Sequence, residues 1–214
     1  MTNVMVDFGR TPLTRDARAP YADGHARNPA PRRLTNMTLA TVVFSIWGVF
    51  WIYWLIAAVG AKQSVRTSRF RPPGLVVIAG VVLLRVFHTG TLAVHSPILQ
   101  AVGLILFASG LGLAVWARIY LGQNWGMPMT QRAEPELVTS GPYRFVRHPI
   151  YSGLLLALLG TALATNLYFL LVLLLLAGYF FYSATVEERT MTTSFPADYP
   201  SYKAHTKMLI PFVL

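Results

Sequence analysis

The chain has 214 residues and a composition unlike that of a soluble domain, because 54% of its residues are hydrophobic and only 12% are charged. Soluble proteins carry about 25% charged residues, so we expect this chain to be covered by lipid. The formal net charge of +10 does not indicate nucleic-acid binding, because the basic residues lie in short segments between apolar runs and form no continuous stripe. The lack of cysteine excludes disulfides, thiol catalysis and thiolate metal sites.

Residues 1–35 differ from the rest of the chain, since they are rich in Pro, Arg, Ala and Asp and show no apolar period. Such a composition is typical of a segment that is disordered or lies on a surface. It contains no apolar core followed by a small-residue cleavage site, so we do not expect a plain signal peptide. Residues 36–214 are expected to form one membrane domain.

Five apolar runs predict an all-α integral membrane protein with five transmembrane helices. They cover residues 39–59, about 74–94, about 97–119, 150–164 and 167–186. A helix needs about 20 residues to cross a hydrocarbon core of about 30 Å, and the fourth run is shorter than that. Only Thr165 and Asn166 separate the last two runs, which predicts a tight antiparallel hairpin.

Lys and Arg residues are concentrated in alternate connections between these runs. They follow the first, third and fifth runs, whereas the connections around His95 and at Thr165–Asn166 have none. The positive-inside rule therefore places the basic connections and the C-terminus in the cytoplasm. Five spans then put the N-terminus outside, although the arginines of residues 1–35 favour the cytoplasm.

One arginine, Arg85, lies inside the second run, and His88 follows it by about one turn. An arginine in a membrane helix faces a partner or a cavity, or its side chain extends to a nearby interface. The sequence leaves these alternatives open.

Polar and aromatic residues that could bind a ligand or take part in catalysis are concentrated in the two segments that flank the terminal hairpin. Proline disfavours the α conformation in the residue before it and is tolerated at the start of a helix. His148 is therefore expected just before the fourth helix, which Pro149 opens. The free N–H groups and the positive dipole end of that helix, with donors from Arg147 and His148, predict a seat for a carboxylate such as that of an amino-acid-like cofactor.

Glu187 and Glu188 follow the last apolar run, at the expected C-terminal end of the fifth helix. Carboxylates there oppose the helix dipole, which predicts a partner for them; the alternative is a solvated helix end. Gly153 and Gly160 lie on one helix face, where they allow close approach of another helix or of a flat ligand.

At these residues the sequence resembles the isoprenylcysteine carboxyl methyltransferase family, within the wider group of membrane methyltransferases that includes phospholipid N-methyltransferases. The pieces that carry the resemblance are 121–125, 137–143, 147–153, Glu187, Glu188, Phe195, Tyr199, Tyr202, Ile210 and Pro211. Their order and spacing make the resemblance specific over about residues 111–214. Residues 1–110 resemble the family only in their pattern of hydrophobic spans.

The resemblance implies a methyltransferase that uses S-adenosylmethionine, bound within residues 121–214 at the cytoplasmic side. A cap would be formed by the loop before the fourth helix and by the C-terminal segment, and a lipophilic acceptor would enter from the surrounding membrane lipids. The oligomeric state stays open. By matching positions, the cofactor-binding residues would be Leu137, Val138, Tyr143, His148, Pro149, Tyr151 and Glu187.

Ser183 stands where the family has an arginine one turn before the glutamate pair. This difference argues against a prenylcysteine carboxylate as the acceptor more than it argues against methyl transfer, so a carboxylate, amine, thiol or phenol remains open. An amine must lose a proton, and Glu188 and His148 are the candidate catalytic residues that would accept it. The alternative functions are a nicotinamide-dependent membrane reductase of the sterol-reductase type and a non-enzymatic transport or assembly factor.

Overall fold

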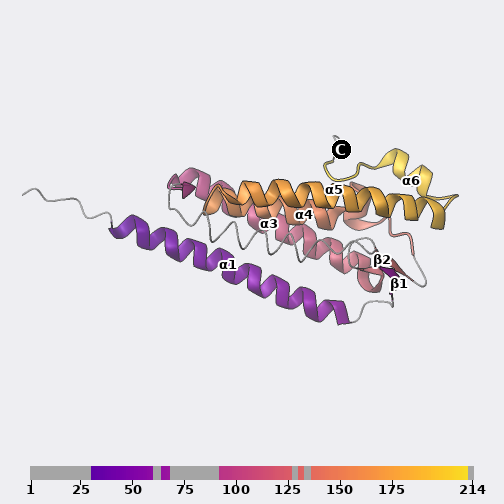
Figure 1. The fold of residues 1–214 in the computed structure, drawn as a ribbon, viewed down its shortest axis with the longest axis horizontal. Coiled ribbons are helices and arrows are strands. Elements are labelled where there is room, and N and C mark those ends of the chain that lie inside the picture. The colour runs from indigo at the N-terminus through magenta and orange to yellow at the C-terminus, as the bar shows by residue number, and fades with distance from the viewer. Residues whose placement is uncertain (1–29, 60–63, 68–91, 127–129, 133–135, 212–214) are drawn as a thin grey trace, which may run out of the picture.

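The computed structural model describes residues 30–59, 64–67, 92–126, 130–132 and 136–211. In this part of the chain the fold is an α-helical bundle with one small two-stranded sheet (Figure 1). The helices are α1 (Ala30–Val59), α3 (Pro97–Leu121), α4 (Pro149–Ala164), α5 (Phe169–Ser194) and α6 (Tyr199–His205). The strands are β1 (Ser64–Thr67) and β2 (Thr130–Arg132), and short 3-10 helices cover Gly122–Asn124 and Gly141–Arg144.

Three described helices are long and apolar enough to cross a membrane, namely Leu39–Val59, Pro97–Asn124 and Phe169–Ser194. They confirm the first, third and fifth predicted runs, and the fourth run forms the shorter apolar helix α4. The second run lies almost entirely outside the described residues, as do Arg85 and His88, so the count of five stays a prediction. Helix α1 begins at Ala30, within the last residues of the segment expected to be a tail.

The connections gather at two ends of the bundle. At one end, β1 pairs with β2 in antiparallel orientation, which joins the connection after α1 to the connection after α3. At the other end, the N–H of Val94 donates to the carbonyl of Thr165 at 3.0 Å, and the N–H of Leu167 donates to the carbonyl of Leu92 at 3.0 Å. The basic connections and the connections without Lys or Arg are thus at opposite ends, as the charge pattern predicted.

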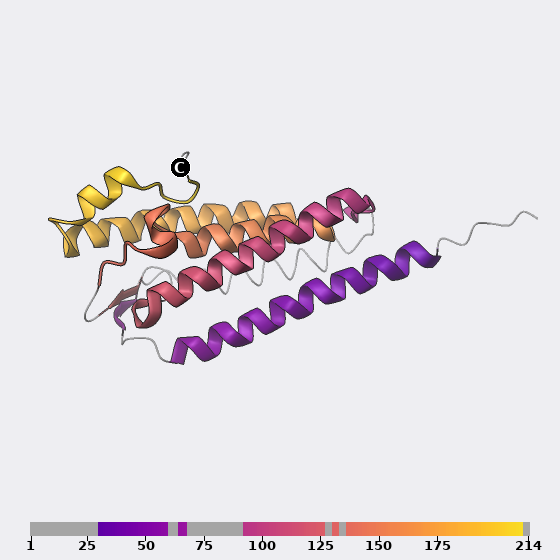
Figure 2. The same ribbon diagram turned by 180° about the vertical axis from the view of Figure 1, so that it is seen from behind.

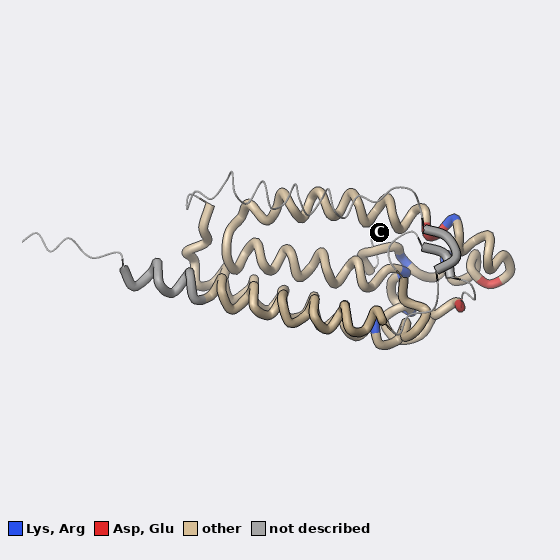
Figure 3. Tube along the Cα trace, turned by 60° about the horizontal axis from the view of Figure 1, so that its bottom comes forward, with Lys and Arg blue, Asp and Glu red and all other residues tan. Residues whose placement is uncertain are grey.

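We call the end that holds β1, β2 and α6 the basic end. The Lys, Arg, Asp and Glu residues that Figure 3 colours lie at or near this end. Seen from both sides, α1 lies along the edge of the bundle opposite the C-terminal segment (Figures 1 and 2). The arrangement leaves an uncharged stretch of helix between the two ends, as a hydrocarbon layer requires.

Helices α3 and α4 touch through glycines on both. A Cβ added at Gly110 would lie 2.6 Å from the carbonyl oxygen of Gly153, and one added at Gly160 would lie 2.5 Å from the carbonyl oxygen of Gly103. The shared face of Gly153 and Gly160 therefore serves helix packing, which was one of its two interpretations. Their partners on α3, Gly103 and Gly110, were not identified from the sequence.

The terminal hairpin has the predicted form, with one difference at its far end. Pro149 opens α4 directly after His148, and α4 ends at Ala164. Helix α5 continues to Ser194, well past the end of the apolar run. The expectation that Glu187 and Glu188 end this helix was wrong, because glutamate is a good helix former and no proline or glycine follows before Pro196.

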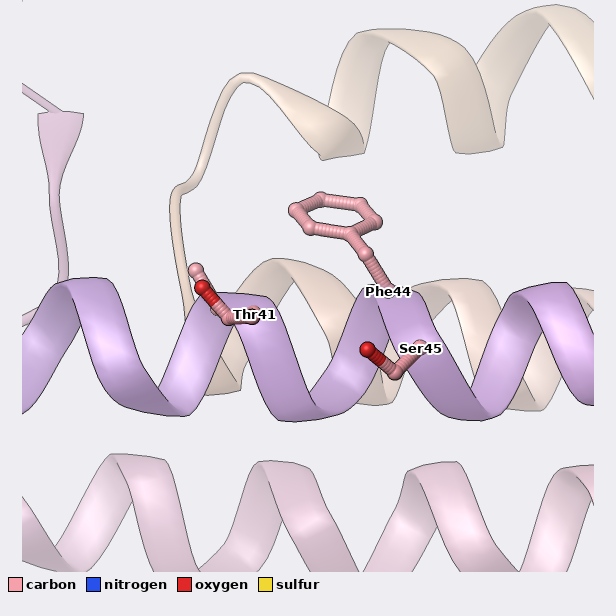
Figure 4. A pocket seen from close by; sticks show the side chains of 4 residues that line it. Thr41, Phe44 and Ser45 are labelled. Carbon is pink, nitrogen blue, oxygen red and sulfur yellow. The ribbon is translucent and has the colours of Figure 1, made fainter.

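Helix α1 exposes many large apolar side chains and is attached to the bundle at a few points. In the middle of the helix, the indole N–H of Trp47 donates to Oγ1 of Thr161 at 3.0 Å. Near the end remote from the basic end, a groove is lined by residues of α1 that include Thr41, Phe44 and Ser45 (Figure 4). The ring of Phe44 lies 5.6 Å from that of Phe169, measured between centroids. The groove contains none of the predicted site residues.

Candidate functional site

His148 is fixed at the start of α4 by the C-terminal segment. Its backbone lies outside the α region, with φ −125° and ψ 60°, as expected of a residue before proline. The N–H of Arg147 donates to the carbonyl of Lys207 at 2.8 Å, and the N–H of His148 donates to the carbonyl of Met208 at 3.1 Å. Residues 206–209 therefore lie against the start of α4, and their role as a cap over a cofactor stays a prediction.

His148, Tyr151 and Phe180 form a stack of three parallel rings, which we call the aromatic stack. The His148 and Tyr151 ring centroids are 5.4 Å apart, and the Tyr151 and Phe180 centroids are 4.5 Å apart, each with an interplanar angle of 4°. Glu187 borders this stack: its Oε1 accepts a hydrogen bond from the Tyr151 hydroxyl at 2.6 Å, and its Oε2 lies 3.5 Å from His148 Nδ1. The geometry joins α4 and α5 at the basic end.

The neighbouring carboxylate, Glu188, is buried among cations. Its Oε1 lies 2.6 Å from Arg147 Nε and 3.7 Å from His148 Nε2, and its Oε2 lies 2.7 Å from Lys203 Nζ. Arg147 Nη1 also donates to the carbonyl of Thr206. The Arg147 side chain was expected to provide donors for an external anion; instead it binds Glu188 and the C-terminal segment.

The protonation of His148 is set by the two glutamates beside it. Burial alone would lower the pKa of this imidazole, but the Glu187 and Glu188 carboxylates outweigh burial and raise its pKa above the ordinary value. The cationic form of His148 is thereby favoured, which makes it a better hydrogen-bond donor than proton acceptor. Burial also raises the pKa of Tyr143, and it raises that of Tyr202 to about 12, so both phenols are neutral donors.

Most predicted site residues meet at the basic end. Tyr143 is buried in its short 3-10 helix, and its carbonyl accepts a hydrogen bond from Tyr202 at 2.6 Å. Val138 packs against the buried cluster that includes Tyr143 and Tyr151. Leu137 is half-buried in the extended segment before that helix. Pro149 and Ser183 are both fully buried. Ser183 lies one turn before Glu187.

Two participants were missed from the sequence. Phe180 lies seven residues before Glu187 and so on the same helix face, a spacing that offered a signal. Lys203 directly follows Tyr202, but nothing local indicates that its ammonium group reaches Glu188. Contacts of this kind depend on how the C-terminal segment folds back.

The residues present fit a sulfonium nucleotide. Aromatic faces attract cations, and the Glu187 carboxylate provides a negative charge and hydrogen-bond acceptors beside them. The buried His148 Nε2 is 3.7 Å from Glu188 Oε1, beyond hydrogen-bond distance, so it retains a donor at this place. Among the described residues, no group of three or more His, Cys, Asp or Glu is arranged to hold a metal ion.

Residues 98–198 match the family model described as phospholipid methyltransferase. The chain is 36% identical over 78 residues to methanethiol S-methyltransferase 1 of Bradyrhizobium diazoefficiens, covering 36% of this chain and 27% of that protein. It is 31% identical over 118 residues to the cobalt-zinc-cadmium resistance protein CzcN of Cupriavidus metallidurans, covering 54% of this chain and 50% of that protein. The chain thus spans between about a quarter and a half of these curated relatives.

The fold is similar to the solved structure of the eukaryotic intramembrane Ras methyltransferase, isoprenylcysteine carboxyl methyltransferase. The TM-score is 0.65 over 87% of this chain and 70% of that one, at 22% sequence identity. At this identity the likeness concerns the fold. Together with the family match, which includes every predicted site residue, it confirms the resemblance to membrane methyltransferases that the motifs indicated.

Proposed function

We propose that this chain is an integral membrane methyltransferase that transfers the methyl group of S-adenosylmethionine to a lipophilic acceptor. The observation that carries the proposal is the convergence of His148, Tyr151 and Glu187 on one cluster at the basic end. The cluster lies within the segment that matches the phospholipid methyltransferase family. A bound cofactor would give His148 and Glu187 a common function, which a transport or assembly factor would not supply.

The basic end is assigned to the cytoplasm, with five spans in total. The separation of basic and non-basic connections supports this orientation through the positive-inside rule. The match in fold to an intramembrane methyltransferase supports a multi-pass arrangement. The C-terminal segment, which lies against the start of α4, forms part of the cap.

S-adenosylmethionine supplies an electrophilic methyl group when it is bound. Glu187 and the ring of Tyr151 would hold its charged part, and a well-placed tyrosine face stabilises a cation by about 0.5–2 kcal/mol. Tyr143, Pro149 and the backbone of Leu137 and Val138 would complete the binding surface. By excluding water and fixing the orientation of the reactants, these residues accelerate an in-line displacement.

The acceptor is proposed to be a lipophilic molecule that reaches the basic end from the bilayer. Ser183 is fully buried and uncharged at the position where the resembling family has arginine, so the site offers no cation there for an acceptor carboxylate. A thiol belongs among the candidates, because one relative is named for methyl transfer to methanethiol. Nothing in the comparisons favours the nicotinamide-dependent reductase.

The direct test uses the purified protein in lipid nanodiscs. Calorimetric titration with S-adenosylmethionine should show binding, while a reduced nicotinamide cofactor should not bind. His148→Ala and Glu187→Ala should each abolish cofactor binding in folded protein. Glu136→Gln, at an exposed carboxylate bonded to Asn124, is the matched control and should bind normally.

The acceptor is sought with the same preparation. Labelled cofactor is incubated with total membrane lipid and with panels of thiols, amines, phenols and prenylated carboxylates, and the labelled product is identified by mass spectrometry. Absence of cofactor binding in the unaltered protein, or full binding in both site variants, would refute the proposal.

A further inference from the structure

The ion pairs that attach the C-terminal segment of residues 199–209 to the rest of the described protein converge on one buried carboxylate, Glu188. The Glu188 side chain is 4% exposed, and each of its two oxygens binds a different cation. Arg147, from the segment before α4, lies 2.6 Å from Oε1, and Lys203, from α6, lies 2.7 Å from Oε2. Glu188 therefore connects three parts of the chain that are distant in sequence.

The remaining attachments are hydrogen bonds of the backbone and of three side chains, Arg147, Ser152 and Tyr202. The carbonyls of Lys207 and Met208 accept from the N–H groups of Arg147 and His148. Arg147 Nη1 also donates to the carbonyl of Lys203 at 3.3 Å. Among the contacts that the structure gives for the α6 side chains, the ion pair with the buried Glu188 carboxylate is made by Lys203. It also fixes the position of residues that follow it and cover His148.

We propose that Lys203 is a positioning residue that, through its ion pair with Glu188, holds the C-terminal segment over His148, and that Glu188 is the anchor of this segment and not the proton acceptor. The inference rests on the proposed function, since His148, which the segment covers, is one of the proposed cofactor-binding residues. A proton taken up by Glu188 would displace one of two close cations, which opposes a role as general base.

Hydrogen–deuterium exchange of the full chain in nanodiscs tests the attachment without any assay of activity. Lys203→Ala should increase amide exchange about 5- to 10-fold in the peptides that contain Arg147, His148 and α6, since a charged partner of a buried carboxylate is lost. Exchange in α3 and the middle of α4 should stay unchanged. Lys203→Arg should restore the slow exchange, because arginine retains the charge.

Lys207→Ala is the matched control, because it removes an exposed lysine side chain from the same segment. It should leave exchange as in the unaltered protein. Glu188→Gln keeps the shape of the anchor and removes its charge, so it should increase exchange in the same peptides as Lys203→Ala. Unchanged exchange in Lys203→Ala or in Glu188→Gln overturns the proposal.

Calorimetry with S-adenosylmethionine then connects the segment to the site. Lys203→Ala and Glu188→Gln should both weaken binding about 10-fold, and Lys203→Arg should bind normally. Normal affinity in Glu188→Gln, expected of a residue that acts only as a base, would overturn the assignment. If the unaltered protein binds no cofactor, the proposed function fails, while the exchange measurements still decide whether Lys203 and Glu188 hold the segment.

Discussion

Replacing Gly110 with alanine should separate the two helices that position the site. A Cβ at this residue would overlap the backbone nitrogen of Ala157 and lie 2.6 Å from the carbonyl oxygen of Gly153. Ordinary contacts between heavy atoms require about 3.5–4.0 Å, so α3 and α4 would have to move apart by about 1 Å. The obstacle is backbone, which cannot change rotamer to make room.

The expected loss in the free energy of unfolding is about 2 kcal/mol, within the range measured for overpacked interiors. Gly112→Ala is the matched control on the same helix, because a Cβ there meets nothing within 4 Å. The control should be neutral or more stable by up to about 1 kcal/mol, owing to the higher helix propensity of alanine. Both substitutions add the same methyl group, so the difference between their free energies of unfolding reports the contact between α3 and α4.

Reversible unfolding in mixed detergent micelles, followed by circular dichroism, measures both variants against the unaltered protein. Gly153→Ala, on the facing helix, should cost a similar amount, and the double variant should cost less than the sum of the two, because one separation relieves both clashes. Equal stability of the Gly110 and Gly112 variants would refute the close packing of α3 on α4.

Three further predictions follow from contacts at the basic end. Arg118→Met should cost about 2–3 kcal/mol in the same unfolding assay, since the buried guanidinium donates to carbonyls near the ends of α1 and α3. Tyr202→Phe should cost about 1 kcal/mol by removing the hydrogen bond to the Tyr143 carbonyl, and calorimetric unfolding measures it. The raised pKa of His148 should make its contribution to stability full below about pH 6.5 and lost as the pH rises through the folded-state value. Unfolding from pH 5.5 to 9 should therefore show a decline that His148→Gln lacks; equal slopes would contradict the charged contacts with the glutamates.

Local features of the sequence were sufficient for the helices and for the residue that opens α4. Apolar runs predicted the described spans, because the length of a hydrophobic stretch is fixed by the thickness of the lipid layer. The position of His148 followed from the proline after it, because proline restricts the backbone of its neighbour. The alternation of basic and non-basic connections predicted which ends meet.

The partners of the glutamates and glycines were decided by tertiary structure. Glu188 meets Lys203 because the C-terminal segment folds back over α5. Gly153 faces Gly110 because two helices pack at one particular register. Hydropathy and spacing describe one segment at a time, whereas these contacts join segments whose relative placement depends on the packing of the whole bundle.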